Sequence, residues 1–360
     1  MPNFIFITCQ IGAERAVKAE IARRWPLFRF AFSQPGFLTF KLPEDLELAA
    51  DFDLESVFAR AYGFSLGKVT GQSAEALAVA AWQKQTIGVV QRVHVWERDR
   101  AAPGDHGYEP AITAEAIEAH RVLLQNCPHP ASLARDASDL CRPGRPGDMV
   151  LDCVVLAPDQ WWVGYHRAQS VSSRYPGGMM CLEMPAEAVS RAWLKMEEAL
   201  RWSQLPILAG ARVAEIGSAP GGASQALLAR GLFVTGIDPA EMAPIVLNHH
   251  HFTHLRRRSM QVRRREFRKI RWLTVDMNVA PRYTLEAVEA IVTHPEVNIR
   301  GLLLTLKLPD WDLARRVPEY LDCVRSWGYN VVRARQMQYN RREICVAALQ
   351  KPFHRKPFKE

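Results

Sequence analysis

The chain has 360 residues, of which 48% are hydrophobic and 23% charged, with a formal net charge of +8. This balance is typical of a folded globular protein, excludes an intrinsically disordered chain, and at this length favours two domains. No apolar run reaches the roughly 20 residues of a transmembrane helix, and the start MPNFIFITCQ lacks a signal-peptide pattern, so we expect a cytoplasmic protein with no membrane association.

The first half of the chain alternates short strands and amphipathic helices in mixed order. Segment patterns predict strands at 4–8, 36–42, 92–97, 150–157 and 161–165, and helices at 12–25, 74–85 and 114–126. This is an α+β pattern rather than a repeating βαβ unit. We place the domain boundary in the polar stretch 170–185, where Tyr175-Pro-Gly-Gly178 interrupts regular structure, and assign residues 1–175 and 176–360 to two domains.

The second half changes to an α/β pattern. Ser190 is a suitable N-cap for a helix over 191–204. Strands are predicted at 212–216, 232–237, 272–275 and 301–306, helices at 223–229, 285–293 and 313–327, and a closing hairpin from 329–335 and 343–349. These elements predict a Rossmann-like fold with a mostly parallel sheet covered by helices on both faces.

Seven cysteines are scattered along the chain without a CxxC pair or a histidine at ligand spacing. We therefore expect reduced thiols and no metal site. The histidines at 249, 250, 251 and 254 have no cysteine or carboxylate beside them, so a solvated polar loop is the preferred interpretation.

A strongly basic run lies in the second half. Residues 256–271, RRRSMQVRRREFRKIR, contain eight arginines and one lysine against a single acid, Glu266. A solvated surface is the plain interpretation of such a run. Beside a catalytic domain, contact with an RNA backbone is the better one.

A glycine-rich turn marks a cofactor site. The strand that ends at Glu215-Ile216 leads into Gly217, Ser218, Ala219, Pro220, Gly221 and Gly222, which open the next helix. Glycines allow close approach of the backbone to a ligand, and the helix N-terminus supplies free N–H donors. One strand later, Asp238 stands where a nucleotide-binding fold places the acid that contacts ribose hydroxyls.

GSAPGG followed by Ser224 resembles the cofactor loop of the FtsJ-like ribosomal RNA 2′-O-methyltransferases, although members commonly have an aromatic residue where this chain has Ala223. CQIGAERAVKAE (9–20) and SRAWLKMEEAL (190–200) resemble segments of the members that methylate a cytidine in bacterial large-subunit ribosomal RNA, which extends the likeness to full length. The resemblance implies S-adenosyl-L-methionine as cofactor and a THUMP-type RNA-binding region in residues 1–175. It places Ser190, Glu215, the 217–222 loop, Asp238 and Asp276 at the cofactor.

The same resemblance implies a catalytic Lys-Asp-Lys-Glu tetrad: Lys195, Asp276, Lys307 and Glu343 occupy the matching positions. A ribose hydroxyl is a weak nucleophile, so a lysine with a pKa lowered toward neutrality would serve as general base. Burial and neighbouring cations lower the pKa of a lysine, whereas carboxylates raise it. We expect Lys307 as base, Asp276 and Glu343 in orienting roles, and a monomeric enzyme.

The chain departs from the family at one position. Arginines follow His254-Leu255, where members place an acid for the adenine amino group, which leaves the group that holds the adenine unidentified. A non-catalytic RNA-binding protein is therefore an alternative, which the complete tetrad disfavours. A methyltransferase acting on a base, protein or small molecule is another, disfavoured by the absence of an Asn/Asp-Pro-Pro-aromatic loop after Asp276 and by the basic surface.

Overall fold

The computed structural model describes residues 3–46, 48–49 and 51–350. The chain divides into two compact units, Met1–Cys181 (unit 1) and Leu182–Glu360 (unit 2), and the division falls within the 170–185 stretch. In the described ranges, no helix has the length and apolar character needed to cross a membrane.

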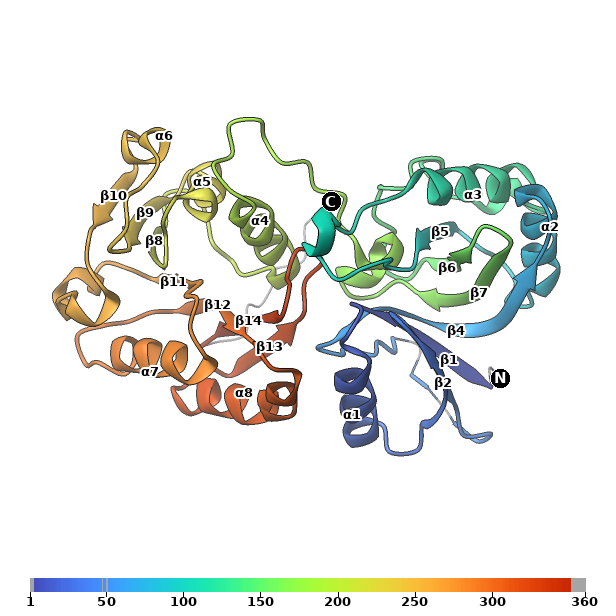
Figure 1. The fold of residues 1–360 in the computed structure, drawn as a ribbon, viewed down its shortest axis with the longest axis horizontal. Helices are drawn as coiled ribbons and strands as arrows, with labels where there is room; N and C mark the ends of the chain where they lie inside the picture. Colours follow the sequence, from blue (N-terminus) through green and yellow to red (C-terminus); the bar gives the residue numbers. More distant parts are fainter. Residues whose placement is uncertain (1–2, 47, 50, 351–360) are drawn as a thin grey trace, which may run out of the picture. The chain divides into compact units, whose positions relative to one another are not determined.

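Unit 1 contains a seven-stranded sheet of order β2-β3-β1-β4-β7-β6-β5, antiparallel except for the parallel pair β5–β6 (Figure 1). Its strands are β1 (Phe4–Cys9), β2 (Arg29–Gln34), β3 (Phe37–Lys41), β4 (Ala59–Thr70), β5 (Arg92–Glu97), β6 (Met149–Ala157) and β7 (Gln160–Arg167). Sequence patterns missed β2 and left β4 unassigned. β4 lies in the middle of the sheet, where Gly63 and Gly164 leave room for the Phe6 ring: a Cβ on either would lie 2.5–2.6 Å from that ring.

The helices of unit 1 are α1 (Glu14–Arg24), α2 (Ala74–Lys84) and α3 (Ala114–Gln125). Helices α2 and α3 pack together and against strands β4, β5 and β7, as Figure 1 shows at the edge of the unit. Leu77, Trp82 and Leu123 lie in the resulting core, and the Trp82 indole N–H donates to the Leu123 carbonyl at 2.9 Å. These contacts confirm the predicted helices and the α+β pattern.

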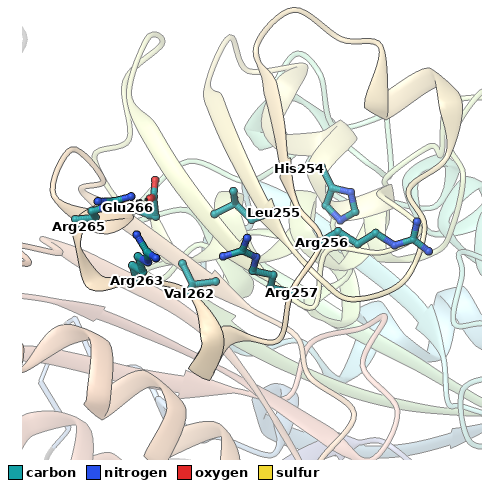
Figure 2. A pocket seen from close by; sticks show the side chains of 8 residues that line it. All are labelled: His254, Leu255, Arg256, Arg257, Val262, Arg263, Arg265 and Glu266. Atoms are coloured by element: carbon teal, nitrogen blue, oxygen red, sulfur yellow. Dashed lines mark hydrogen bonds and ion pairs between the residues drawn. The ribbon is translucent and has the colours of Figure 1, made fainter.

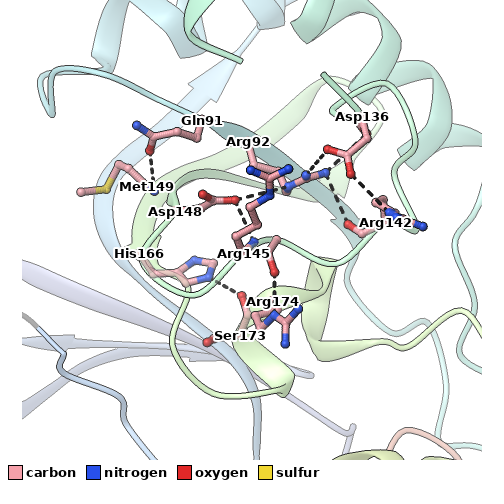
Figure 3. A network of polar contacts seen from close by, with 11 residues as sticks. Gln91, Arg92, Asp136, Arg142, Arg145, Asp148, Met149, His166, Ser173 and Arg174 are labelled. Atoms are coloured by element: carbon pink, nitrogen blue, oxygen red, sulfur yellow. Dashed lines mark hydrogen bonds and ion pairs between the residues drawn. The ribbon is translucent and has the colours of Figure 1, made fainter. Parts of the chain in front are cut away.

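The irregular stretch 127–148 is held by a buried arginine (Figure 3). The Arg92 guanidinium donates to Asp136 Oδ1 at 2.6 Å and lies within 3.5 Å of the carbonyl oxygens of Asp136 and Arg142. A disulfide also links Cys141 in this stretch to Cys181, the last residue of unit 1, and their Cα atoms are 5.8 Å apart. The expectation of reduced thiols is therefore wrong for this pair, because a separation of 40 residues gives no pairing signal in the sequence.

A buried polar pair lies between neighbouring strands of the same sheet. His166 Nδ1 on β7 is 2.7 Å from Asp152 Oδ2 on β6, and His166 Nε2 is 2.7 Å from the carbonyl oxygen of Ser173 (Figure 3 labels His166 and Ser173). His166 therefore connects the end of β7 to the 3₁₀ turn Ser172–Arg174.

Unit 2 contains a second seven-stranded sheet, of order β10-β9-β8-β11-β12-β14-β13. Its strands are β8 (Arg212–Ile216), β9 (Phe233–Ile237), β10 (Phe252–Leu255), β11 (Trp272–Val275), β12 (Gly301–Lys307), β13 (Val331–Arg335) and β14 (Glu343–Leu349). The five neighbouring strands β10, β9, β8, β11 and β12 are parallel, and β14 is antiparallel to both β12 and β13. The mostly parallel sheet and the closing hairpin are confirmed; the short edge strand β10 was not predicted.

The helices of unit 2 are α4 (Ala192–Ser203), α5 (Gly222–Leu228), α6 (Pro244–Leu247), α7 (Pro281–Val292) and α8 (Val317–Ser326). Helices α4 and α5 pack together, as do α7 and α8, and the two pairs flank the sheet (Figure 1). This is a doubly wound Rossmann-like arrangement, in which the carboxyl ends of the parallel strands share one edge and gather ligands there.

Candidate active site

The glycine turn after β8 is closely packed against its surroundings. Gly217 has a φ of +82°, and a Cβ at this position would lie 2.3 Å from the carbonyl oxygen of Asp276. A Cβ on Gly222, the first residue of α5, would lie 2.2 Å from Ser190 Oγ. Both positions therefore require glycine, for conformation at the first and for space at both. The turn is brought directly against Asp276 and Ser190.

Asp238 fixes the end of β9 to this turn. Its Oδ2 accepts a hydrogen bond from the backbone N–H of Ala219 at 3.2 Å, and its Oδ1 accepts one from Ala240 at 2.8 Å. The side chain is half-buried, and each carboxylate oxygen has a second lone pair. The carboxylate is thus held at the carboxyl edge of the sheet, beside the glycine turn.

Glu215 lies beneath the turn. Its side chain is 1% exposed, and its carboxyl group is hydrogen-bonded to the Ser224 hydroxyl on α5. Burial raises the pKa of Glu215 to about 8, so the neutral acid predominates at pH 7. The buried Ser218 hydroxyl donates to Met242 Sδ at 3.6 Å. Glu215 and Ser218 therefore support the turn from within.

Ser190 does not cap the helix that follows it. Helix α4 has Arg191 as its N-cap residue, without a side-chain cap, and Ser190 contributes its carbonyl oxygen to the Trp193 N–H at 3.1 Å. The Ser190 hydroxyl is buried and has no hydrogen-bond partner among the described residues. Because a buried unpartnered hydroxyl is rare, and this one faces Gly222, it is suited to a ligand bound over the turn.

The four side chains of the expected tetrad meet at the carboxyl edge. Lys195 Nζ on α4 lies 2.7 Å from Asp276 Oδ2 and 2.9 Å from Glu343 Oε1. Lys307 Nζ at the end of β12 lies 2.9 Å from Asp276 Oδ1 and pairs with Glu343 Oε2. Each lysine thus contacts both carboxylates, and each carboxylate binds Lys195 through one oxygen and Lys307 through the other. The tetrad therefore forms a closed ring of four ion pairs.

Backbone pairing explains how distant residues form this ring. Asp276 directly follows β11, the parallel neighbour of β12, and Lys307 lies opposite Glu343 in the β12–β14 register. Asn340 supports the acid, since its Nδ2 donates to Glu343 Oε1 at 3.3 Å. Asn340 was not recognised from the sequence, although an asparagine three residues before the strand is a plausible turn signal.

The pKa values of Asp276, Glu343 and Lys307 favour the charged forms. Burial alone would raise the pKa values of Asp276 and Glu343, but the charges of Lys195 and Lys307 lower both below their ordinary values. Burial alone would lower the pKa of Lys307, but Asp276 and Glu343 outweigh it and raise that pKa. The expectation of a lowered pKa for Lys307 is therefore wrong for the protein without cofactor, because the two carboxylates stabilise the charged ammonium form of Lys307.

The basic run lies beyond the edge strand of the same sheet. Residues 256–258 directly follow β10, and the rest of the run includes two 3₁₀ helices, η5 (Ser259–Gln261) and η6 (Arg264–Phe267). The arginines at 256, 257, 258, 263, 265 and 268 are exposed. Residues 256–258 therefore lie at the edge that also carries the glycine turn and the tetrad, whereas the run ends at the opposite edge, where the Arg271 N–H donates to the Arg212 carbonyl at the start of β8.

Comparison with known proteins agrees with this geometry. Residues 188–349 match the model of the FtsJ-like methyltransferase family. Ribosomal RNA large subunit methyltransferase M of Citrobacter koseri is 26% identical over 366 residues, covering 96% of this chain and 95% of that protein. The protein of the same name from Salmonella arizonae is 27% identical over 367 residues, with the same coverage.

A solved structure, that of TrmN from Thermus thermophilus, covers 96% of this chain and 99% of its own at 12% identity and a TM-score of 0.35. The family model and the full-length relatives, rather than this weak structural similarity, confirm the resemblance seen in the sequence.

Proposed function

We propose, given that residues 188–349 belong to the FtsJ-like methyltransferase family, that this protein transfers a methyl group from S-adenosyl-L-methionine to a ribose 2′-hydroxyl of ribosomal RNA. By similarity to relatives named for the large ribosomal subunit, the substrate is large-subunit (23S) RNA. That the target nucleotide is a cytidine rests on the family resemblance of the sequence. We further propose that the enzyme acts in the cytoplasm and as a monomer.

The observation that carries the proposal is the closed ring of Lys195, Asp276, Lys307 and Glu343 beside the glycine turn. A structural role alone would not require two lysines and two acids in one half-buried cluster, because buried ion pairs give little net stability. Clustered groups with shifted pKa values at a sheet edge that collects ligands are typical of catalytic sites.

The residues of the turn suit the proposed cofactor. Gly217 and Gly222 allow the turn to pack against Asp276 and Ser190, the Ser190 hydroxyl is buried without a partner in the described chain, and Asp238 offers a fixed acceptor for ribose hydroxyls. S-adenosyl-L-methionine supplies an activated methyl group on a positively charged sulfonium, so the reaction needs no metal ion. Glu215 takes an indirect part, since it holds Ser224 and the base of the turn.

The tetrad orients the hydroxyl and receives its proton. We assign the base to Lys307, whose neutral form must arise in the loaded site, because the carboxylates hold the ammonium in the protein alone. Exclusion of water and additional positive charge both lower the pKa of a lysine. Asp276 and Glu343 fix the position of Lys307, while Lys195 keeps both acids ionised. Alignment of the reacting atoms supplies much of the remaining rate acceleration.

RNA recognition is assigned to unit 1 together with the basic run. The THUMP character of unit 1 rests on the resemblance of its first strand and helix, whereas the exposed arginines after β10 are an electrostatic contact for phosphates. Folded RNA shape and an unstacked target nucleotide would then provide specificity.

The experiment is methyl transfer by the full chain from labelled S-adenosyl-L-methionine to unmodified large-subunit RNA, followed by digestion to nucleosides. The proposal predicts label in a ribose-methylated nucleoside. Label in a base would assign the protein to another class of RNA methyltransferase. Binding of RNA without cofactor binding would favour a non-catalytic RNA-binding protein.

A further inference from the structure

Three polar side chains meet inside the sheet of unit 1: His94 on β5, Asp152 on β6 and His166 on β7. The strand register places His94 directly beside Asp152, and His166 two residues beyond Gly164, which lies opposite Asp152. One donor atom of each residue lies within 4.8 Å of the donor atoms of the other two. All three side chains are buried, at 1%, 0% and 4% exposure. We call them the His-Asp-His cluster.

The cluster contains polar atoms that the protein does not satisfy. Both ring nitrogens of His94 and the Oδ1 atom of Asp152 are buried without a hydrogen-bond partner in the ranges that the structure describes. Such atoms are rare in native proteins and mark places where a water molecule or an ion binds. A ring nitrogen of His94 and a carboxylate oxygen of Asp152 are therefore free to coordinate an ion inside the sheet.

His166 is oriented as histidines that bind metal ions commonly are. Its Nε2 lies 2.7 Å from the carbonyl oxygen of Ser173, which can only accept, so Nε2 carries the hydrogen of this bond. Its Nδ1 faces Asp152 Oδ2 at 2.7 Å, and two lone-pair atoms at this distance require a proton or another cation between them. A histidine that ligates a metal through one nitrogen usually donates its other N–H to a carbonyl or carboxylate, which fixes the ring.

The surroundings leave Asp152 as the anion of the cluster. A Cβ on Gly63 of β4 would lie 2.7 Å from Asp152 Oδ2, so glycine at this position allows the carboxylate to lie where it does. The nearby guanidinium group of Arg92 is neutralised elsewhere, since it lies 2.6 Å from Asp136 Oδ1 and 3.9 Å from Asp148 Oδ2. The charge of Asp152 is therefore available to balance a cation bound between the two histidines.

The donor set indicates which ion fits. Imidazole nitrogens with a carboxylate suit Zn²⁺ and related divalent transition metals, whereas Ca²⁺ and Mg²⁺ prefer oxygen ligands. Ligand atoms around a tetrahedral zinc ion are about 3.3 Å apart. The spacings in the cluster begin at 2.7 Å and do not exceed 4.8 Å, a range that includes this value. The two oxygens of Asp152 and one nitrogen from each histidine supply four donor atoms.

We propose that the His-Asp-His cluster binds one Zn²⁺ ion through a ring nitrogen of His94, Nδ1 of His166 and the carboxylate of Asp152. The ion takes the place of the proton between Asp152 and His166. Its role is structural, because it joins three strands and, through Ser173, the 3₁₀ turn that follows them. Sequence spacing gave no sign of this site, because its residues meet only through strand pairing. The inference goes beyond the proposed function and does not rest on it, since methyl transfer uses no metal ion.

Histidines of unit 2 compete for zinc in any binding experiment. His249, His250 and His251 are consecutive, and the rings of His250 and His251 are 4.2 Å apart. His254, which Figure 2 shows among the exposed arginines that follow β10, has its Nε2 3.0 Å from the Asp238 carbonyl oxygen. None of these four side chains is buried. A variant of this group is therefore needed beside a variant of the cluster.

The test uses the full chain, produced in medium supplemented with zinc and purified in metal-free buffer. Bound metal is counted by mass spectrometry, and Zn²⁺ affinity is measured after metal removal by competition with a chromophoric chelator. The variants are His94→Leu, His120→Leu and His250→Ala/His251→Ala. His120 on α3 is the matched control, because it is also a buried histidine of unit 1 with an unpartnered Nε2 among the described residues, but lies outside the cluster.

We expect the parent to retain one zinc ion per chain and His94→Leu to bind Zn²⁺ at least about 100-fold more weakly. Both other variants should keep the affinity of the parent. Without metal, His94→Leu should have a Tm no lower than the parent, because leucine removes two buried nitrogens that have no partner in the described chain. Zinc should raise the Tm of the parent and slow hydrogen exchange in residues 166–175, and should do neither in His94→Leu.

A parent that holds no zinc, or a His94→Leu variant that binds it as tightly as the parent, would overturn the proposal. Loss of zinc from His250→Ala/His251→Ala alone would assign the ion to the histidines of unit 2 and would overturn it as well. If His94→Leu does not fold, hydrogen exchange of the parent with and without zinc gives the result: unchanged protection of residues 166–175 would contradict the site. Methyl transfer to RNA is a separate measurement, and its outcome leaves this proposal unaffected.

Discussion

Lys307 at the end of β12 lies directly opposite Glu343 at the start of β14, and its ammonium group contacts that carboxylate. The pairing register therefore places a cation and an anion on adjacent strands at the edge that binds ligands. Asp276 and Lys195 complete the ring on the other side. Each member of the ring sets the charge of its neighbours, so single substitutions should alter the pH dependence of the reaction as well as its rate.

Lys195→Ala should slow methyl transfer and shift its pH dependence. Loss of this cation leaves the two carboxylates to act on Lys307 alone, so the pKa of Lys307 rises further and the neutral form becomes rarer. We expect a rate about 100-fold lower at pH 7 that recovers partly as the pH rises. Lys195→Arg, which keeps the charge, should retain more activity. Identical pH profiles for parent and Lys195→Ala would contradict the electrostatic role.

Gly217→Ala should abolish tight cofactor binding. The new methyl group would lie 2.3 Å from the carbonyl oxygen of Asp276, so the turn must move. Gly210→Ala is the matched control, because Gly210 has a φ of +80° with nothing within 4 Å of its Cβ position. It should lose only about 1–2 kcal/mol of stability from its left-handed conformation. The dissociation constant of S-adenosylhomocysteine, measured by calorimetry, should rise at least tenfold for Gly217→Ala and stay unchanged for the control.

The stability of unit 2 should fall as the pH rises from about 4.5 to about 8. The folded pKa of Glu215 is about 8, above that of the unfolded chain, so the folded state holds a proton that the unfolded state loses across this range. Glu215→Gln keeps an uncharged partner for Ser224 and should remove this dependence. The free energy of unfolding of Glu215→Gln and of the parent, measured with denaturant, should be similar at pH 5. At pH 9 the variant should be more stable by a few kcal/mol. An equal difference at both pH values would mean that Glu215 is ionised in the fold. Exposed Glu286 offers the control substitution Glu286→Gln.

Arg92→Ala should loosen the 133–148 segment of unit 1. The buried guanidinium is bonded to Asp136 and to two carbonyl groups of this segment, and its loss should cost about 3 kcal/mol. Arg121→Ala, which removes an exposed helical pair with Glu118, should cost less than about 1 kcal/mol. Hydrogen exchange should increase in 133–148 for Arg92→Ala alone. Unchanged protection there would show that the remaining contacts hold the segment without Arg92.

Much of unit 2 was predictable because its elements follow simple periodic rules. Asp276 and Lys307 end predicted strands, and parallel strands place their carboxyl ends at one edge, so their position at that edge was expected, whereas their grouping with Lys195 and Glu343 was implied by the family resemblance. Glycine at 217 and 222 indicated a backbone that a ligand can approach closely; their packing against Asp276 and Ser190 was not predicted.

Features that depend on long-range geometry were not predictable. The pKa of Lys307 is lowered by burial and raised by the two carboxylates. Which effect is larger depends on atomic distances that the sequence does not give. Ser190 has the sequence context of a helix cap, yet its hydroxyl points elsewhere because α4 begins one residue later. Edge strand β10 is four residues long and only one of them is fully buried, so it shows little apolar periodicity. The link from Cys141 to Cys181 has no local signal.

The most direct measurement compares single-turnover methyl transfer to large-subunit RNA by the parent, Lys307→Ala and Lys307→Arg, each saturated with cofactor and RNA. We predict rates lower by a factor of about 10²–10⁴ in both variants, with unchanged cofactor affinity, because arginine keeps the ion pairs with Asp276 and Glu343 but cannot release a proton at accessible pH. A Lys307→Arg variant as fast as the parent would contradict the assignment of the base and leave Lys307 as a positioning residue.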